Sequence, residues 1–156
     1  DRARLRTGDE SWLTPPAGRM MRDAIQRLPP EMAKLATGVL RKLRAQLPGA
    51  VELVYDKANS LVIGFCADER ATTVINSVAV YRRWINLYFF EGGELPDPDG
   101  LLQGSGSMVR SIRILEVSDL DRPAVKKLLA EARKRADPPL SPKAKRRVIV
   151  KQSRKS

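Results

Sequence analysis

Residues 50–66 read AVELVYDKANSLVIGFC, and the rest of the fold can be built outward from this stretch. In its first half the apolar residues V, L and Y occupy every second position, which is typical of a half-buried strand. The turn formers DKANS follow, and the apolar run LVIGFC then indicates a second strand. The stretch therefore predicts strands over residues 50–55 and 61–66 that pair as an antiparallel hairpin.

Further strands are expected on the C-terminal side of this hairpin. Residues 73–81 and 84–90 are rich in β-formers and are separated only by Arg82 and Arg83, which indicates a second hairpin. Residues 111–116 supply another strand. Because no crossover helix is predicted between successive strands, a parallel arrangement is disfavoured. We expect an antiparallel sheet of about five strands.

Helices flank the strands on both sides in the sequence. Amphipathic spacing predicts helices over residues 20–28 and 31–47, with prolines or a Pro-Gly pair at their ends. A third helix begins after Asp121, which is a suitable cap, and has Pro123 in its first turn. This order predicts an α+β fold in which the helices pack on one face of the sheet.

The positive charge is confined to the C-terminal end of the chain. Residues 1–121 contain 16 basic and 16 acidic side chains, whereas residues 122–156 contain 13 basic and two acidic ones, so the last segment carries the whole net charge of +11. We therefore expect a disordered leader over residues 1–19, native or appended, a single domain over 20–136, and a basic tail over 137–156.

The basic tail is a candidate for contact with nucleic acid or another polyanion, because lysine and arginine neutralise phosphates. An inert, solvated tail is the favoured alternative. The residues concerned are Lys143, Lys145, Arg146, Arg147, Lys151, Arg154 and Lys155.

The composition excludes several classes of active site. The chain has no histidine, which removes Ser-His-Asp and Cys-His catalysis and histidine-ligated metal sites. Its one cysteine, Cys66, cannot form an internal disulfide or a thiolate zinc site, and it is expected to be a small buried hydrophobe rather than a reactive thiol. We expect a cytoplasmic, non-enzymatic protein without a cofactor, and we find no membrane-spanning or secretory pattern.

The most unusual segment is the glycine- and proline-rich stretch 92–106. Its glycines allow backbone N–H groups to approach an anion, with Arg110 and Arg113 close behind in the sequence. Structural turns are the favoured alternative, and a hard-cation site is a third. The carboxylates available to such a cation are Glu91, Glu94, Asp97 and Asp99.

An aromatic run follows the second predicted hairpin turn. Trp84, Tyr88, Phe89 and Phe90 lie in the most hydrophobic strand, so packing in the core is favoured over a stacking platform for bases.

Three parts of the chain resemble the YdhG-like domains of unknown function. They are the run ELVY at 52–55, the strand WINLYFF at 84–90, and the loop Gly93-x-Leu95-Pro96-Asp97-Pro98 with Leu101-Leu102-x-Gly104-x-Gly106-x-x-x-Arg110. The resemblance covers about residues 20–135 and implies a frataxin-like arrangement. It also implies iron-chaperone-like handling of metal. Because the first long helix of this chain is cationic, the carboxylates offered for that role are those of residues 91–99.

The leading hypothesis is a non-enzymatic domain that binds a small anionic ligand or a protein partner at the glycine loop and the sheet edge. Its expected binding residues are Glu52, Tyr55, Gly104, Gly106, Arg110 and Arg113. Nucleic-acid association through the tail and metal handling through the loop carboxylates are the two alternatives.

Overall fold

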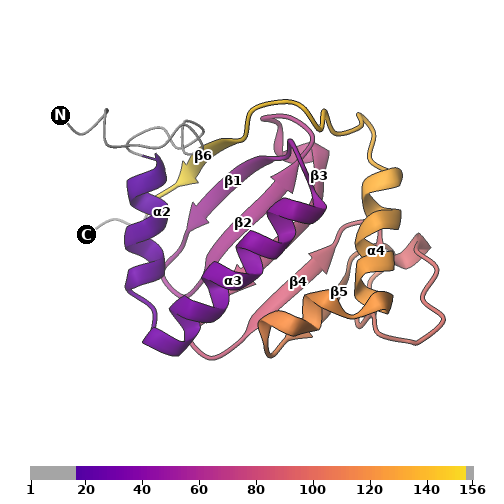
Figure 1. The fold of residues 1–156 in the computed structure, drawn as a ribbon, viewed down its shortest axis with the longest axis horizontal. Helices are drawn as coiled ribbons and strands as arrows, with labels where there is room; N and C mark the ends of the chain where they lie inside the picture. Colours follow the sequence, from indigo (N-terminus) through magenta and orange to yellow (C-terminus); the bar gives the residue numbers. More distant parts are fainter. Residues whose placement is uncertain (1–16, 154–156) are drawn as a thin grey trace.

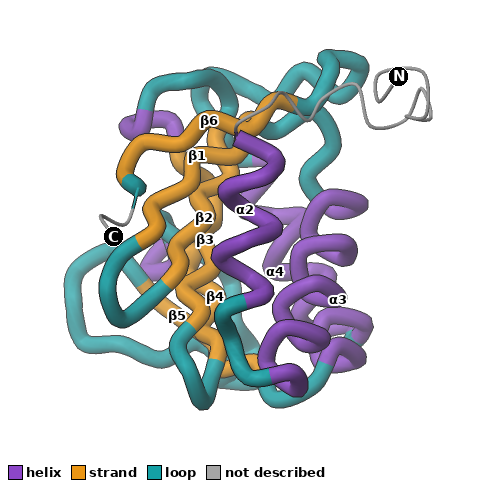
Figure 2. Tube along the Cα trace, turned by 90° about the vertical axis from the view of Figure 1, so that its left-hand side faces the viewer, coloured by secondary structure: helices purple, strands orange, loops and turns teal. Residues whose placement is uncertain are grey.

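The structure is a computed structural model, and it describes residues 17–153. In this range the chain forms a six-stranded sheet with three α-helices packed on one face (Figures 1 and 2). The α+β class expected from the sequence is confirmed. The strands are β1 (Val51–Asp56), β2 (Leu61–Cys66), β3 (Val74–Val80), β4 (Ile85–Phe89), β5 (Arg110–Ile114) and β6 (Arg147–Gln152).

The two predicted hairpins form the centre of the sheet. β1 pairs antiparallel with β2, Leu53 opposite Gly64, and β3 pairs antiparallel with β4, Val78 opposite Leu87. β2 and β3 join the hairpins, and β5 extends the sheet beyond β4. Alternating strand residues therefore point to the helices, and the others point to the opposite face.

The helices are α2 (Ala17–Gln26), α3 (Pro30–Gln46) and α4 (Pro123–Lys134). Both α3 and α4 begin with proline, whose missing N–H is not needed in a first turn. Gly49 follows α3 with a φ of 81°, a conformation that side chains with a Cβ rarely adopt. Residues 1–16 of the predicted leader lie outside the described residues, whereas residues 17–19 belong to α2 and are helical rather than disordered.

The C-terminal segment differs most from the sequence-based expectation. β6 lies parallel to β1, so the strand order is β5-β4-β3-β2-β1-β6 and the sheet is mixed rather than antiparallel. Figure 1 shows the chain passing from α4 across the end of the sheet to reach β1. The reason is that β1 presents an unpaired edge, and the apolar run of residues 148–150 can cover it. Val148 is buried beneath the helices as a result.

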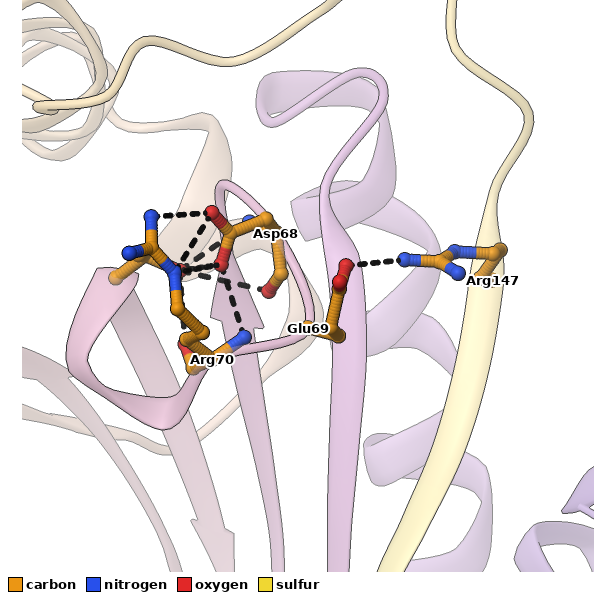
Figure 3. Close-up of polar contacts among 5 residues, drawn as sticks. Asp68, Glu69, Arg70 and Arg147 are labelled. Carbon is orange, nitrogen blue, oxygen red and sulfur yellow. Dashed lines mark hydrogen bonds and ion pairs between the residues drawn. The ribbon is translucent and has the colours of Figure 1, made fainter.

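Polar contacts hold β6 and the neighbouring turn in place (Figure 3). Arg147 donates to Glu69 at 2.8 Å, and Asp68 in the same turn accepts hydrogen bonds from Arg70 and Thr73. The hydrogen bonds from Arg70 lower the pKa of Asp68 to about 2. Part of the segment predicted as a tail is thus bonded to the domain.

The main core lies between the sheet and the helices, where Phe65, Phe89, Leu40 and Leu43 are fully buried. A second, smaller cluster on the helix-free face includes Cys66. Burial raises the pKa of the Cys66 thiol to about 12, so it is a protonated, buried side chain as expected.

Candidate functional site

The glycine loop is built around the side chain of Arg110. Arg110 Nη1 donates hydrogen bonds to the backbone carbonyls of Gly106 and Val109. A Cβ on Gly92 would lie 2.5 Å from Arg110 Cβ, and one on Gly104 would lie 3.1 Å from the Val109 carbonyl oxygen. Gly92 and Gly104 therefore make room for an arginine whose side chain bonds within its own loop. This agrees with the alternative in which the glycines of residues 92–106 serve structural turns.

The loop carboxylates do not converge. Asp97 accepts hydrogen bonds from the backbone N–H groups of Leu101 and Leu102, both at 2.9 Å, and so closes a turn. No three His, Cys, Asp or Glu residues within the described range 17–153 are grouped so that they could hold a metal ion. Glu91, Glu94 and Asp99 are exposed.

Glu52 and Tyr55, both expected at the binding site, lie on opposite faces of β1. Glu52 faces the helices and is fully buried, where it accepts two hydrogen bonds from Arg44 at 2.9 Å and one from Arg146 at 3.1 Å. Tyr55 packs with the small cluster on the helix-free face. They therefore do not share a pocket.

The predicted polyanion-binding residues are also divided. Arg146 and Arg147 make ion pairs with Glu52 and Glu69. Lys143, Lys145 and Lys151 are exposed, while Arg154 and Lys155 lie outside the described residues.

Arg113 is the predicted residue that lies beside an exposed aromatic ring. Its guanidinium carbon lies 4.9 Å from the centre of the Trp84 ring, and its Nε donates to Asn86 Oδ1 at 3.4 Å. Trp84 is 38% exposed, so it does not belong to the core in which the sequence placed it. Arginine over tryptophan is a favourable cation–π arrangement.

Trp84 also lines a cavity of about 350 Å³ at one end of the sheet, which we call the hairpin cavity. Its walls come from the C-terminal part of α2, the β1–β2 turn and the β3–β4 turn, which lie together at the lower left of Figure 1. The sequence separates these three segments widely, and the fold brings them to one place because both hairpins turn at the same end of the sheet.

Positive charge dominates the wall of the hairpin cavity. Arg27, Lys57, Arg82 and Arg83 line it, and Asp56 supplies the one carboxylate in the lining. Arg27 is ion-paired with Asp56. Within residues 17–153, neither Lys57, Arg82 nor Arg83 forms an ion pair.

Two aromatic rings complete this wall. Tyr81 and Trp84 flank the β3–β4 turn with ring centroids 5.4 Å apart. Desolvation and the neighbouring Tyr88 raise the pKa of Tyr81, so it stays a neutral phenol. The sequence shows two arginines between two aromatic residues at positions 81–84. Arg27 and Lys57 are distant from this turn in the chain, so the sequence alone did not indicate that they lie beside it.

Comparison with known proteins gives no relative for this chain: no family model, no curated protein and no solved structure matches it. None of the helices in the described part of the chain is long and apolar enough to cross a membrane.

Proposed function

We propose that this chain is a binding domain for a small anionic ligand, and that the ligand occupies the hairpin cavity. The observation that carries the proposal is the set of three cations, Lys57, Arg82 and Arg83, that line one cavity without an ion pair among residues 17–153. All three side chains are exposed, so they are available to a ligand, and an anion bound between them would offset their mutual repulsion.

The chemistry of the wall favours a phosphate- or carboxylate-bearing molecule. Arginine presents a planar fork of N–H donors that matches the oxygens of these groups, and such charge-assisted hydrogen bonds are short and strong. The Trp84 ring adds an apolar contact, and Arg113 above it adds further positive charge. A volume of about 350 Å³ suits a small molecule. Relative to the sequence-based hypothesis, the proposal keeps Arg113 and moves the site from the glycine loop to the two hairpin turns.

The test is calorimetric titration with pyrophosphate at low ionic strength. Replacing both turn arginines, R82A/R83A, should weaken binding by at least about tenfold, because each lost charged hydrogen bond is worth about 1.5–3 kcal/mol. The matched control K143A/K145A removes the same charge from an exposed part of the C-terminal segment and should leave the affinity unchanged. No pyrophosphate binding, or equal losses in the two double variants, would contradict the proposal.

Polyanion association through the C-terminal segment is the second candidate, supported by the exposed side chains of Lys143, Lys145 and Lys151. It predicts an affinity for single-stranded nucleic acid that falls with salt at a logarithmic slope of about −0.7 per phosphate contacted. Here K143A/K145A should lower both the affinity and the slope, and R82A/R83A should not. The two double variants thus separate the two candidates in both directions.

A further inference from the structure

A second, larger cavity of about 780 Å³ lies between α2 and α3, and we call it the helix groove. Figure 1 shows α2 and α3 running apart from the short connection that joins them. The α2 residues in its wall, including Gly18, Met21, Arg22 and Ile25, recur at helical spacing and form one face of the helix.

The floor of the helix groove is apolar. Met21 and Leu40 are buried beneath it, and Ile25 and Val117 of η4 (Val117–Asp121) are further apolar lining residues. Val117 reaches this position because residue 38 is glycine: a Cβ there would lie 2.5 Å from Val117 Cγ2. The groove is therefore a built feature of the helix packing with an apolar base.

The rim of the helix groove has one sign of charge. Its charged lining residues are Arg22, Lys34, Arg41 and Arg44, and no carboxylate lines it. Arg44 bonds to the buried Glu52 and places its Nη2 3.5 Å from Met21 Sδ, so it spans from α3 to α2. Arg22, Lys34 and Arg41 make no ion pair with any residue that the structure describes.

We propose that the helix groove binds a single-chain anionic amphiphile, with its hydrocarbon part on the apolar floor and its carboxylate or phosphate head among the rim cations. Charge complementarity selects this occupant. A neutral hydrocarbon offers no anion to Arg22, Lys34 and Arg41, and a compact anion leaves the apolar floor in contact with water. The hairpin cavity is smaller, at about 350 Å³, and its lining includes the carboxylate of Asp56.

The experiment is calorimetric titration of the full chain with dodecanoate below its micelle concentration, with amide chemical shifts of Gly18 and Gly38 as the location readout. Saturable binding with shifts at both glycines is expected. R22A/R41A should weaken it by at least about tenfold, since each 1.4 kcal/mol of lost interaction is a factor of ten. Both side chains are exposed, so this variant should fold normally, which circular dichroism checks.

Three comparisons make the result specific. R82A/R83A removes the same charge from the hairpin cavity and should leave dodecanoate binding unchanged, whatever its effect on pyrophosphate. Dodecyltrimethylammonium has the same chain and the opposite charge, and it should not bind. Dodecyl phosphate should bind like dodecanoate, because the two share the anionic head. Equal binding of the cationic amphiphile, an unaltered affinity in R22A/R41A, or shifts confined to other residues would overturn the proposal.

Discussion

Replacing Glu52 with glutamine should destabilise the protein strongly, although the change is nearly isosteric. The Glu52 side chain is 1% exposed and accepts three hydrogen bonds from two guanidinium groups. Desolvation lowers the pKa of Arg146, and the Glu52 carboxylate opposes that effect. A glutamine amide carries no charge to do so, and its NH₂ group faces a cation. E52Q therefore removes the carboxylate that lies between Arg44 and Arg146 and offsets their mutual repulsion.

The size of the effect follows from the burial of the three side chains. Removing one partner of a buried ion pair costs about 3–5 kcal/mol. Arg44 and Arg146 are 22% and 19% exposed, so water can solvate them in part and the lower end applies. We expect E52Q to lower the free energy of unfolding by about 3 kcal/mol, which for a chain of this size lowers Tm by about 9 °C.

Urea denaturation of the wild type and variants measures this loss as a shift in midpoint at constant m-value. Glu94→Gln is the matched control, because Glu94 is exposed, and it should change stability by less than about 0.5 kcal/mol. The double variant E52Q/R146M should recover part of the loss, since it also removes one of the two like charges. A loss below about 1 kcal/mol in E52Q, or strict additivity in the double variant, would refute the reasoning.

Three further predictions concern the backbone and two titratable groups. Gly49→Ala should cost more than about 2 kcal/mol in urea unfolding, because φ is 81° and the new Cβ would lie 1.9 Å from the Ser141 carbonyl oxygen. Gly100→Ala, with a φ of 64° and open space, should cost about 1 kcal/mol, and equal losses would contradict the clash. Asp68 should titrate near pH 2 by carboxyl NMR; its contribution to stability is present above its unfolded pKa of about 3.9 and is lost as pH falls through 2. A midpoint near 4 would be inconsistent with its hydrogen bonds. Cys66, with a pKa of about 12, should react with a thiol reagent at pH 8 only after unfolding, and rapid labelling of the native protein would count against its burial.

The candidate site followed from the sequence only in part. Arg113 was singled out from its position after the glycine loop, and it does lie in an exposed cationic and aromatic region. Arg110 followed from the same pattern, yet its side chain bonds back to the loop carbonyls. Sequence spacing predicts the face of a strand on which an arginine lies. It does not predict whether the guanidinium donates its hydrogen bonds to backbone carbonyls or to a ligand.

Glu52 illustrates the same limit. The alternation set Glu52 on the strand face opposite Val51, Leu53 and Tyr55, and it gave no sign that this opposite face packs against the helices and buries Glu52. An isolated buried carboxylate is costly, so this position requires charged partners. Its partners were not visible, since Arg44 lies on a helix and Arg146 is 94 positions away in the sequence. The reading of the C-terminal segment as a separable tail missed this contact.

α2 begins three residues and ends two residues before the helix predicted over residues 20–28. The sequence by itself determined the two hairpins, the approximate extent of α3, the start of α4 near Pro123 and the exclusion of histidine chemistry. Those features depend on alternation, on Pro and Gly at element ends, and on composition, all of which act within a few residues. Only the tertiary structure decided that residues 147–152 form a parallel edge strand, that Glu52 is paired with two arginines, and that the hairpin turns meet α2 around one cavity. Each of these features depends on which strand edge, charged group or turn lies nearby in the folded protein. The packing of the whole chain determines these neighbours, so a local sequence pattern does not reveal them.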